Sequence, residues 1–180
     1  SDLKELRAVE GVSDIEYGYS CYVTMRDGNM SHILKFQSMT EDIDQPTSVV
    51  GNLPMEPDEV ALLDFWADEQ GIGIGDRVEL KHDDTSGDDD GMEYLKSDTF
   101  TVTALVQNPA YVSRLNGTLG VSNMGSGSVD CVGFVTSSAF DESKFEGAYS
   151  NVYVRCDVAR GKNTFFDDYK QAMSPIVDEV

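Results

Sequence analysis

Apolar residues recur with a period of two in several parts of the chain. Between 100 and 106 every second residue is apolar, and the same alternation runs through 17–25. A period of two places such side chains on one face of a β-strand. The second pattern is followed at 26–29 by an Asp-Gly turn, and 31–37 then alternates again, which is typical of a β-hairpin. We therefore expect an N-terminal hairpin and a well-formed strand near the middle.

One stretch in the first half of the chain predicts a strand, a short helix and a second strand. Residues 60–63 are an apolar run of strand length. Asp64 follows as an N-cap for a helix over 65–70, and Gly71 stands where a left-handed C-cap residue belongs. Residues 77–80 alternate like a half-buried strand.

Further elements are expected on both sides of this stretch. Residues 39–50 are polar and rich in turn formers, which indicates a crossing between two lobes. Strands are expected over 130–135 and 149–158, and a last helix over 165–180. In the strand over 149–158 the residues expected to face inward are Val152, Val154, Cys156 and Val158.

The net charge of the chain argues against nucleic acids and anionic membranes as partners. The chain of 180 residues has 33 acidic and 13 basic residues, a formal net charge of −20. Nucleic acids and anionic membrane surfaces repel such a chain, and no basic stripe with interleaved aromatic residues is present. The sequence contains no run of 18 apolar residues, so it predicts no membrane-spanning helix. Both ends have helix-like sequence, as expected for a soluble piece excised from a larger protein.

The most acidic stretch, 81–91, allows two interpretations. Its charge fits an exposed, solvated loop, and its density of aspartates also fits a calcium site. The EF-hand spacing is missing, since no bidentate glutamate follows at the required distance. If a metal binds, the candidate ligands are Asp83, Asp84, Asp88, Asp89 and Asp90.

No catalytic or cofactor-binding residues are predicted. The chain has only two histidines and lacks the GxSxG and HExxH motifs. It therefore offers few residues that could form the nucleophile–base pair of a hydrolase. The glycine- and serine-rich stretch 110–128 lacks both GxxxxGK[ST] and GxGxxG, which excludes the usual nucleotide cradles. A loop of this length is usually functional or mobile. We expect it to contact a partner through Tyr111, Arg114 and Leu115.

Three cysteines, Cys21, Cys131 and Cys156, follow no zinc or disulfide-framework spacing. Buried thiols acting as small apolar residues are the favoured interpretation.

Several segments occur in an order that resembles a known family. The segments are Gly51-x-Leu53-Pro54, Pro57-Asp58-Glu59-Val60, Gly73-Ile74-Gly75-Asp76-x-Val78-x-Leu80, the strand over 100–107 with Asn108-Pro109-Ala110-Tyr111, Phe134-Val135, and Tyr149-Ser150-Asn151-Val152-Tyr153-Val154. Together they resemble the extracytoplasmic domain of FtsX-like ABC transporter permeases, the group that includes the MacB and LolC/LolE types. Thr136 replaces a usual proline, Ala104 replaces a usual glycine, and 83–90 is an acidic insertion.

The resemblance implies an α+β fold in two lobes. The first lobe would combine 1–47 with 141–180, and 48–140 would form an inserted, mainly β lobe with one short helix. Cys21 and Cys156 would both face the core of the first lobe, so a disulfide between them is a hypothesis.

The resemblance also implies a function without catalysis on the extracytoplasmic side of the cell membrane. Membrane-embedded segments would flank the domain, a second permease copy would complete the unit, and a cytoplasmic ABC ATPase would bind the ATP. The domain would pass conformational change to an exported substrate or an extracellular protein. The alternative is a secreted or surface module that binds calcium or a peptide through the aspartates at 83–90.

Overall fold

The computed structural model describes residues 6–81, 91–111, 119, 127–145, 147–157, 160–161, 167–168, 170–171 and 173–174. The chain divides into two compact units, one formed by Ser1–Tyr17 with Val152–Val180 and the other by Gly18–Asn151. Among the described residues, no helix combines the length and the apolar character needed to cross a membrane. In its described residues the larger unit has a mixed sheet and one short α-helix, which makes it α+β, as expected.

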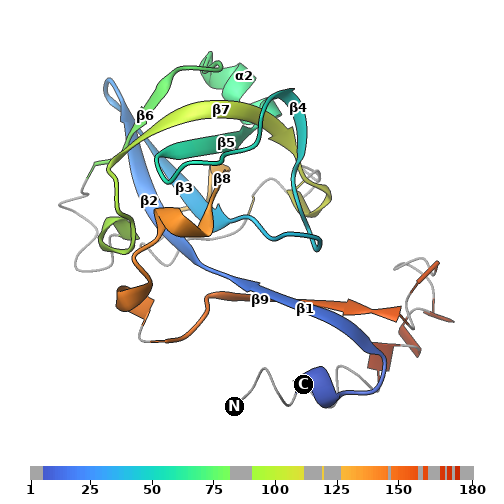
Figure 1. Ribbon diagram of the computed structural model, residues 1–180. Coiled ribbons are helices and arrows are strands. Elements are labelled where there is room, and N and C mark those ends of the chain that lie inside the picture. Colours follow the sequence, from blue (N-terminus) through green and yellow to red (C-terminus); the bar gives the residue numbers. More distant parts are fainter. Residues whose placement is uncertain are drawn as a thin grey trace. The chain divides into compact units, whose positions relative to one another are not determined.

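A seven-stranded sheet forms the larger unit, and Figure 1 shows its strands curving around a common interior. Its strand order is β2-β3-β8-β5-β7-β4, and β6 also pairs with β7. The strands are β2 (Ser20–Asp27), β3 (Met30–Ser38), β4 (Thr47–Gly51), β5 (Glu59–Leu63), β6 (Arg77–Glu79), β7 (Thr99–Gln107) and β8 (Cys131–Val135).

The predicted hairpin is confirmed by β2 and β3, which pair antiparallel from Ser20↔Gln37 to Asp27↔Met30. Gly28 in the turn has φ 57°, a left-handed conformation that glycine adopts without steric cost. Cys21, Val23 and Met25 are buried on one face, as their alternation predicts. The alternating run is interrupted at Tyr19, because β1 (Val12–Gly18) ends just before it and Tyr17 is 44% exposed.

Buried strands form the centre of the sheet. β8 pairs parallel with β3 and antiparallel with β5, and β5 pairs parallel with β7. All five residues of β8 are buried, which explains why its sequence is continuously apolar rather than alternating. In the core the rings of Phe36 and Phe100 meet edge to face, with centroids 5.0 Å apart. Such strands fix the positions of the loops at their ends.

The predicted helix is α2 (Asp64–Gln70), which follows β5 directly. Gly71 caps its C-terminus with φ 70° and ψ 26°, as predicted. The expectation for Asp64 is wrong in one respect: Leu63 is the N-cap and Asp64 is the first helical residue. The Asp64 carboxylate instead accepts a hydrogen bond from the Phe65 N–H at 2.7 Å.

Short 3₁₀ helices connect several strands. They are η1 (Gly91–Tyr94), η2 (Pro109–Tyr111), η4 (Ser137–Ala139) and η5 (Glu142–Phe145). Buried Phe140 follows η4, and its ring lies against those of Tyr19 and Phe145. These contacts hold the segment of η4 and η5 against Tyr19, the residue before β2.

Strand β4 lies in the stretch expected to be a polar crossing. It pairs antiparallel with β7, and all five of its residues are exposed. A strand at the edge of a sheet with no buried face leaves no alternation in its sequence, which explains why the pattern misses it.

The smaller unit contains a two-stranded sheet of β1 and β9 (Asn151–Cys156). The two strands run antiparallel, since Ser13 Oγ donates to the Arg155 carbonyl while the Asp157 N–H donates to the Gly11 carbonyl. The expectation that Val152 faces inward is wrong, because its side chain is 44% exposed. Val158 and most of the expected last helix lie outside the described residues.

The two units have other boundaries than the lobes expected from the sequence. Residues 18–47 and 141–151 group with 48–140. The reason is long-range pairing, because β3 from the first expected lobe lies in parallel register with β8 from the second. None of the three cysteines is in a disulfide, and Cys21 and Cys131 are buried as small apolar residues. Cys21 and Cys156 belong to different compact units, so the hypothesis of a disulfide between them stays a prediction.

Candidate functional site

A cavity of about 380 Å³ opens where the parallel strands β5 and β7 end. Both strands present their carboxyl ends to it, and α2 begins at its edge. Its described lining residues are Leu63, Asp64, Phe65, Asp68, Gln107, Asn108 and Tyr111. The cavity thus combines apolar and aromatic wall residues with two carboxylates.

Hydrogen bonds to neutral donors hold the Asp64 side chain. Its Oδ2 accepts from the Gln107 Nε2 at 2.6 Å, and its Oδ1 accepts from the Phe65 N–H. Asp68 lies one helical turn later on the same face of α2 and is exposed. Neither carboxylate has an ion pair within the part of the chain that the structure describes.

Asn108 and Tyr111 form the rigid side of the cavity. Asn108 is 1% exposed; its Nδ2 donates to the Asp44 carbonyl at 3.0 Å, and its Oδ1 accepts from the Ala110 N–H at 2.8 Å. The Tyr111 hydroxyl donates to Gln37 Oε1 at 2.9 Å, and its ring contacts that of Phe134. Both side chains are thereby fixed before anything binds.

Burial sets the protonation behaviour of this region. Desolvation raises the pKa of Tyr111 to about 12, and the negative charge of Asp44 acts in the same direction. Desolvation also raises the pKa of Asp44, which the Asn108 side chain and Lys35 oppose. For the Lys35 ammonium, burial lowers the pKa and Asp44 opposes the change. Asp44 has φ 57°, so the loop after β3 contains a left-handed residue beside this cluster.

A second cavity of about 810 Å³ lies against β2, η1 and η5 on the same unit. Its described lining contains two cations, Lys35 and Lys144, together with the aromatic residues Tyr22, Tyr94 and Phe145. Lys35 thus lines this cavity and also interacts with the charge of Asp44.

Of the partner-contact residues expected from the sequence, the structure places Tyr111. It lines the first cavity and is half-buried there. Arg114 and Leu115 lie outside the described residues, as do the candidate calcium ligands Asp83, Asp84, Asp88, Asp89 and Asp90.

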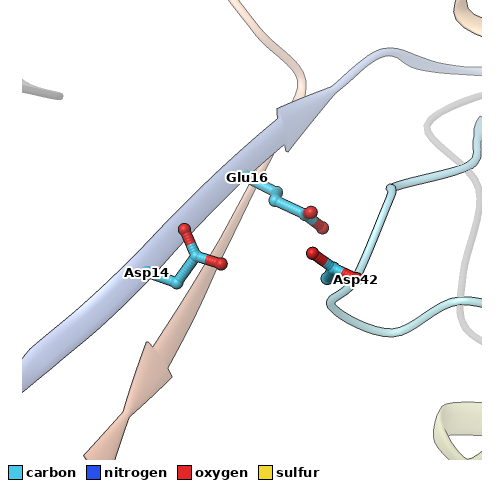
Figure 2. A group of neighbouring side chains, drawn as sticks. All are labelled: Asp14, Glu16 and Asp42. Carbon is cyan, nitrogen blue, oxygen red and sulfur yellow. The ribbon is translucent and has the colours of Figure 1, made fainter.

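Two further carboxylates lie on one strand of the smaller unit. Asp14 and Glu16 lie two residues apart on β1 and extend to the same side of the strand (Figure 2). Asp14 already pairs with Arg155, whose Nη1 lies 3.6 Å from its Oδ2. Asp42, also drawn in Figure 2, follows β3 in the other compact unit. Since calcium takes six to eight oxygen ligands, the two carboxylates of β1 do not suffice alone.

His32 on β3 is a partly buried cross-strand residue. Its Nδ1 lies 3.9 Å from Asp130 Oδ2, and its ring meets the ring of Trp66 edge to face at 5.4 Å. Its Nε2 is buried without a hydrogen-bond partner among the residues described. No nucleophilic side chain is paired with it in that part of the chain, so the geometry suits packing.

Three lining residues, Asp64, Asp68 and Gln107, are not predicted from the sequence as site residues. Asp64 has a ready interpretation as a helix cap, and Gln107 as the end of a strand. The signal that indicates them is that two apolar strands each end at a polar residue, after Leu63 and after Val106. Ligand sites often lie outside the carboxyl ends of parallel strands, but the parallel pairing is visible only in the structure.

Comparisons with known proteins give distant structural similarities. No protein-family model matches the sequence, and no curated protein matches it. The structure is similar to the extracellular domain of the noncanonic ABC-type transporter YknZ from Gram-positive bacteria, with a TM-score of 0.46, 12% identity, and coverage of 98% of this chain and 81% of that chain. It is also similar to the periplasmic region of MacB from Actinobacillus actinomycetemcomitans, with a TM-score of 0.44, 13% identity, and coverage of 98% and 72%.

Proposed function

We propose that this chain is the extracytoplasmic domain of an FtsX-like ABC transporter permease and has no catalytic role of its own. In the intact protein, membrane-embedded segments flank the domain, and a second permease copy completes the working unit. A cytoplasmic ABC ATPase binds and hydrolyses ATP. The domain couples that hydrolysis to export of a substrate, or to signalling to an extracellular protein, by changing conformation.

The order of the motif series carries this proposal. Its segments follow one another over 51–154, and most of them lie in strands of the structure, with α2, η1, η4 and η5 between them. Residues 57–63 lead into and form β5, 73–80 form a turn and β6, and 100–107 form β7. Asn108-Pro109-Ala110-Tyr111 then forms the exit through η2, which borders the first cavity.

The geometry of that exit supports the proposal that a partner binds there. Tyr111 lies near the start of the stretch 110–128, which is expected to contact a partner, and its ring and hydroxyl are fixed by Phe134 and Gln37. A rigid wall beside an open cavity loses little entropy on binding. We expect an extracellular partner or an exported substrate to contact this end of the larger unit.

Epitope insertion tests the cellular location directly. An epitope placed between Gly28 and Asn29 would lie in an exposed hairpin turn, where a side chain on Gly28 would meet no other atom. In protoplasts that express the full-length protein, we expect an antibody to stain the epitope without permeabilisation. A cytoplasmic epitope fused to the ATPase is the control and should stain only after permeabilisation. Staining of both epitopes only after permeabilisation contradicts the proposal.

A further inference from the structure

The cavity at the ends of β5 and β7 contains negative charge beside apolar walls. Asp64 and Asp68 project from one face of α2, four residues apart, while Leu63, Phe65 and Tyr111 supply aliphatic and aromatic surface. A cation with an aliphatic stem, which is the chemistry of lysine and arginine side chains, matches both parts of such a lining.

The charge in the cavity is not neutralised by the described lining. The two hydrogen bonds that Asp64 accepts come from an amide side chain and a backbone N–H, both neutral. A carboxylate offers about four lone-pair sites, so Asp64 retains capacity for a cation. Asp68 is exposed, and the described lining contains no lysine or arginine.

The walls are preorganised. Asn108 uses both ends of its amide within the protein, the Tyr111 hydroxyl is bound to Gln37, and Gln107 orients Asp64. A ligand therefore contacts side chains that are already in place, which lowers the entropic cost of binding. The ring of Tyr111 also offers a face for a cation–π contact.

We infer that this cavity binds a lysine or arginine side chain of a partner polypeptide. The charged head would lie between Asp64 and Asp68, and the stem along Phe65 and Tyr111. The net charge of −20 would attract a basic partner from a distance and accelerate its encounter. The inference deepens the proposed function, on which the extracellular nature of the partner rests, by naming the partner's chemistry.

An NMR titration of the 180-residue chain tests the binding. The probe is a short glycine peptide with one central lysine, and the matched control probe has that lysine acetylated. We expect saturable shifts confined to the amides of 63–68 and 107–111, with a dissociation constant on the order of 1 mM for the lysine probe. The acetylated probe should give none. Equal binding of both probes, shifts spread over the surface, or no shifts would overturn the inference.

Charge-matched variants distinguish binding of the lysine probe in the cavity from its general attraction to an acidic protein. Asp64→Asn combined with Asp68→Asn preserves the shape of both side chains and removes both charges. At position 64 one acceptor oxygen becomes a donor, which a flip of the Gln107 amide can accommodate. The double variant should weaken lysine-probe binding by about tenfold or more. Asp27→Asn combined with Glu41→Gln removes the same charge from exposed positions and should change it by less than about twofold. Equal weakening in both double variants would overturn the inference.

One more variant tests whether the chain's own arginine occupies the cavity. Arg114 follows Tyr111 by three residues in the sequence. If Arg114→Ala leaves probe binding unchanged, the occupant comes from a partner. If only the Arg114→Ala chain binds the probe, the cavity belongs to Arg114 and the inference fails. All these results concern the cavity alone, whereas epitope staining concerns the location, so either proposal can fail without the other.

Discussion

Single side chains at the end of β7 shape the first cavity. Asn108 joins the loop after β3 to η2, because its amide bonds both the Asp44 carbonyl and the Ala110 N–H. Tyr111 joins η2 to β3 through its bond to Gln37. Since Asn108 and Gln37 are 1% and 3% exposed, water does not readily replace these bonds.

Replacing Asn108 by alanine should therefore be costly. Asn108→Ala leaves a backbone carbonyl and a backbone N–H without their partner, and we expect it to reduce the free energy of unfolding by about 1–3 kcal/mol. Urea denaturation measures the loss. The exposed Asn52→Ala variant is the control and should stay within about 0.5 kcal/mol of the parent. Equal values for the two variants would contradict the role given to Asn108.

Tyr111 should make stability depend on pH in the alkaline range. Burial raises its pKa from 10.0 to about 12 in the folded protein, so between these values the folded state holds a proton that the unfolded state has lost. The contribution of Tyr111 is fully present below pH 10 and is lost as the pH rises towards 12. Tyr111→Phe removes this dependence, so its stability should fall less steeply there than that of the parent. Phenolate absorbance checks the assignment: the increase that the parent shows near pH 12 should be smaller in the variant. Parallel pH curves for the two proteins would contradict it.

Strands with buried faces are the elements that the sequence predicts well. The alternation over 100–106 and the apolar run over 60–63 both indicate strands, and β7 and β5 lie there. Exposed β4 has no such pattern, because an edge strand buries no face. The pairing of β3 with β8, about a hundred residues away, depends on tertiary packing that no local pattern contains. The cavity cannot be predicted from the sequence for the same reason, because the cavity depends on the parallel pairing of β5 with β7.

The close contact between β8 and the core gives a prediction at the scale of the element. A Cβ on Gly133 would meet two Phe36 ring carbons at 2.8 and 2.9 Å and a Val60 methyl at 3.1 Å. We expect Gly133→Ala to cost about 1–3 kcal/mol through overpacking. If the Phe36 ring is the obstacle, Gly133→Ala should cost less when it is introduced into a Phe36→Leu background. Urea denaturation of the four proteins gives the coupling, and strictly additive costs would contradict the contact.

The charge of the whole molecule opposes its compact state. With a net charge of −20, like charges repel across the surface, and added salt screens that repulsion. Raising the ionic strength from about 0.01 to about 0.15 M shortens the screening length from about 30 to about 8 Å. We expect Tm to rise, by about 2–4 °C for each 1 kcal/mol of repulsion removed. Calorimetry in sodium chloride measures this, and a constant or falling Tm would show that local ion pairs dominate.

At the scale of the whole molecule, we propose that this chain is the exterior part of a membrane permease. The hydropathy of the coding sequence on either side of Ser1 and Val180 distinguishes a permease from a secreted module. For a permease we expect one apolar segment of about 20 residues just before Ser1 and three more after Val180. Flanking sequences without such segments, or a cleaved signal peptide leading directly into this chain, would rule out the permease and favour a secreted binding module.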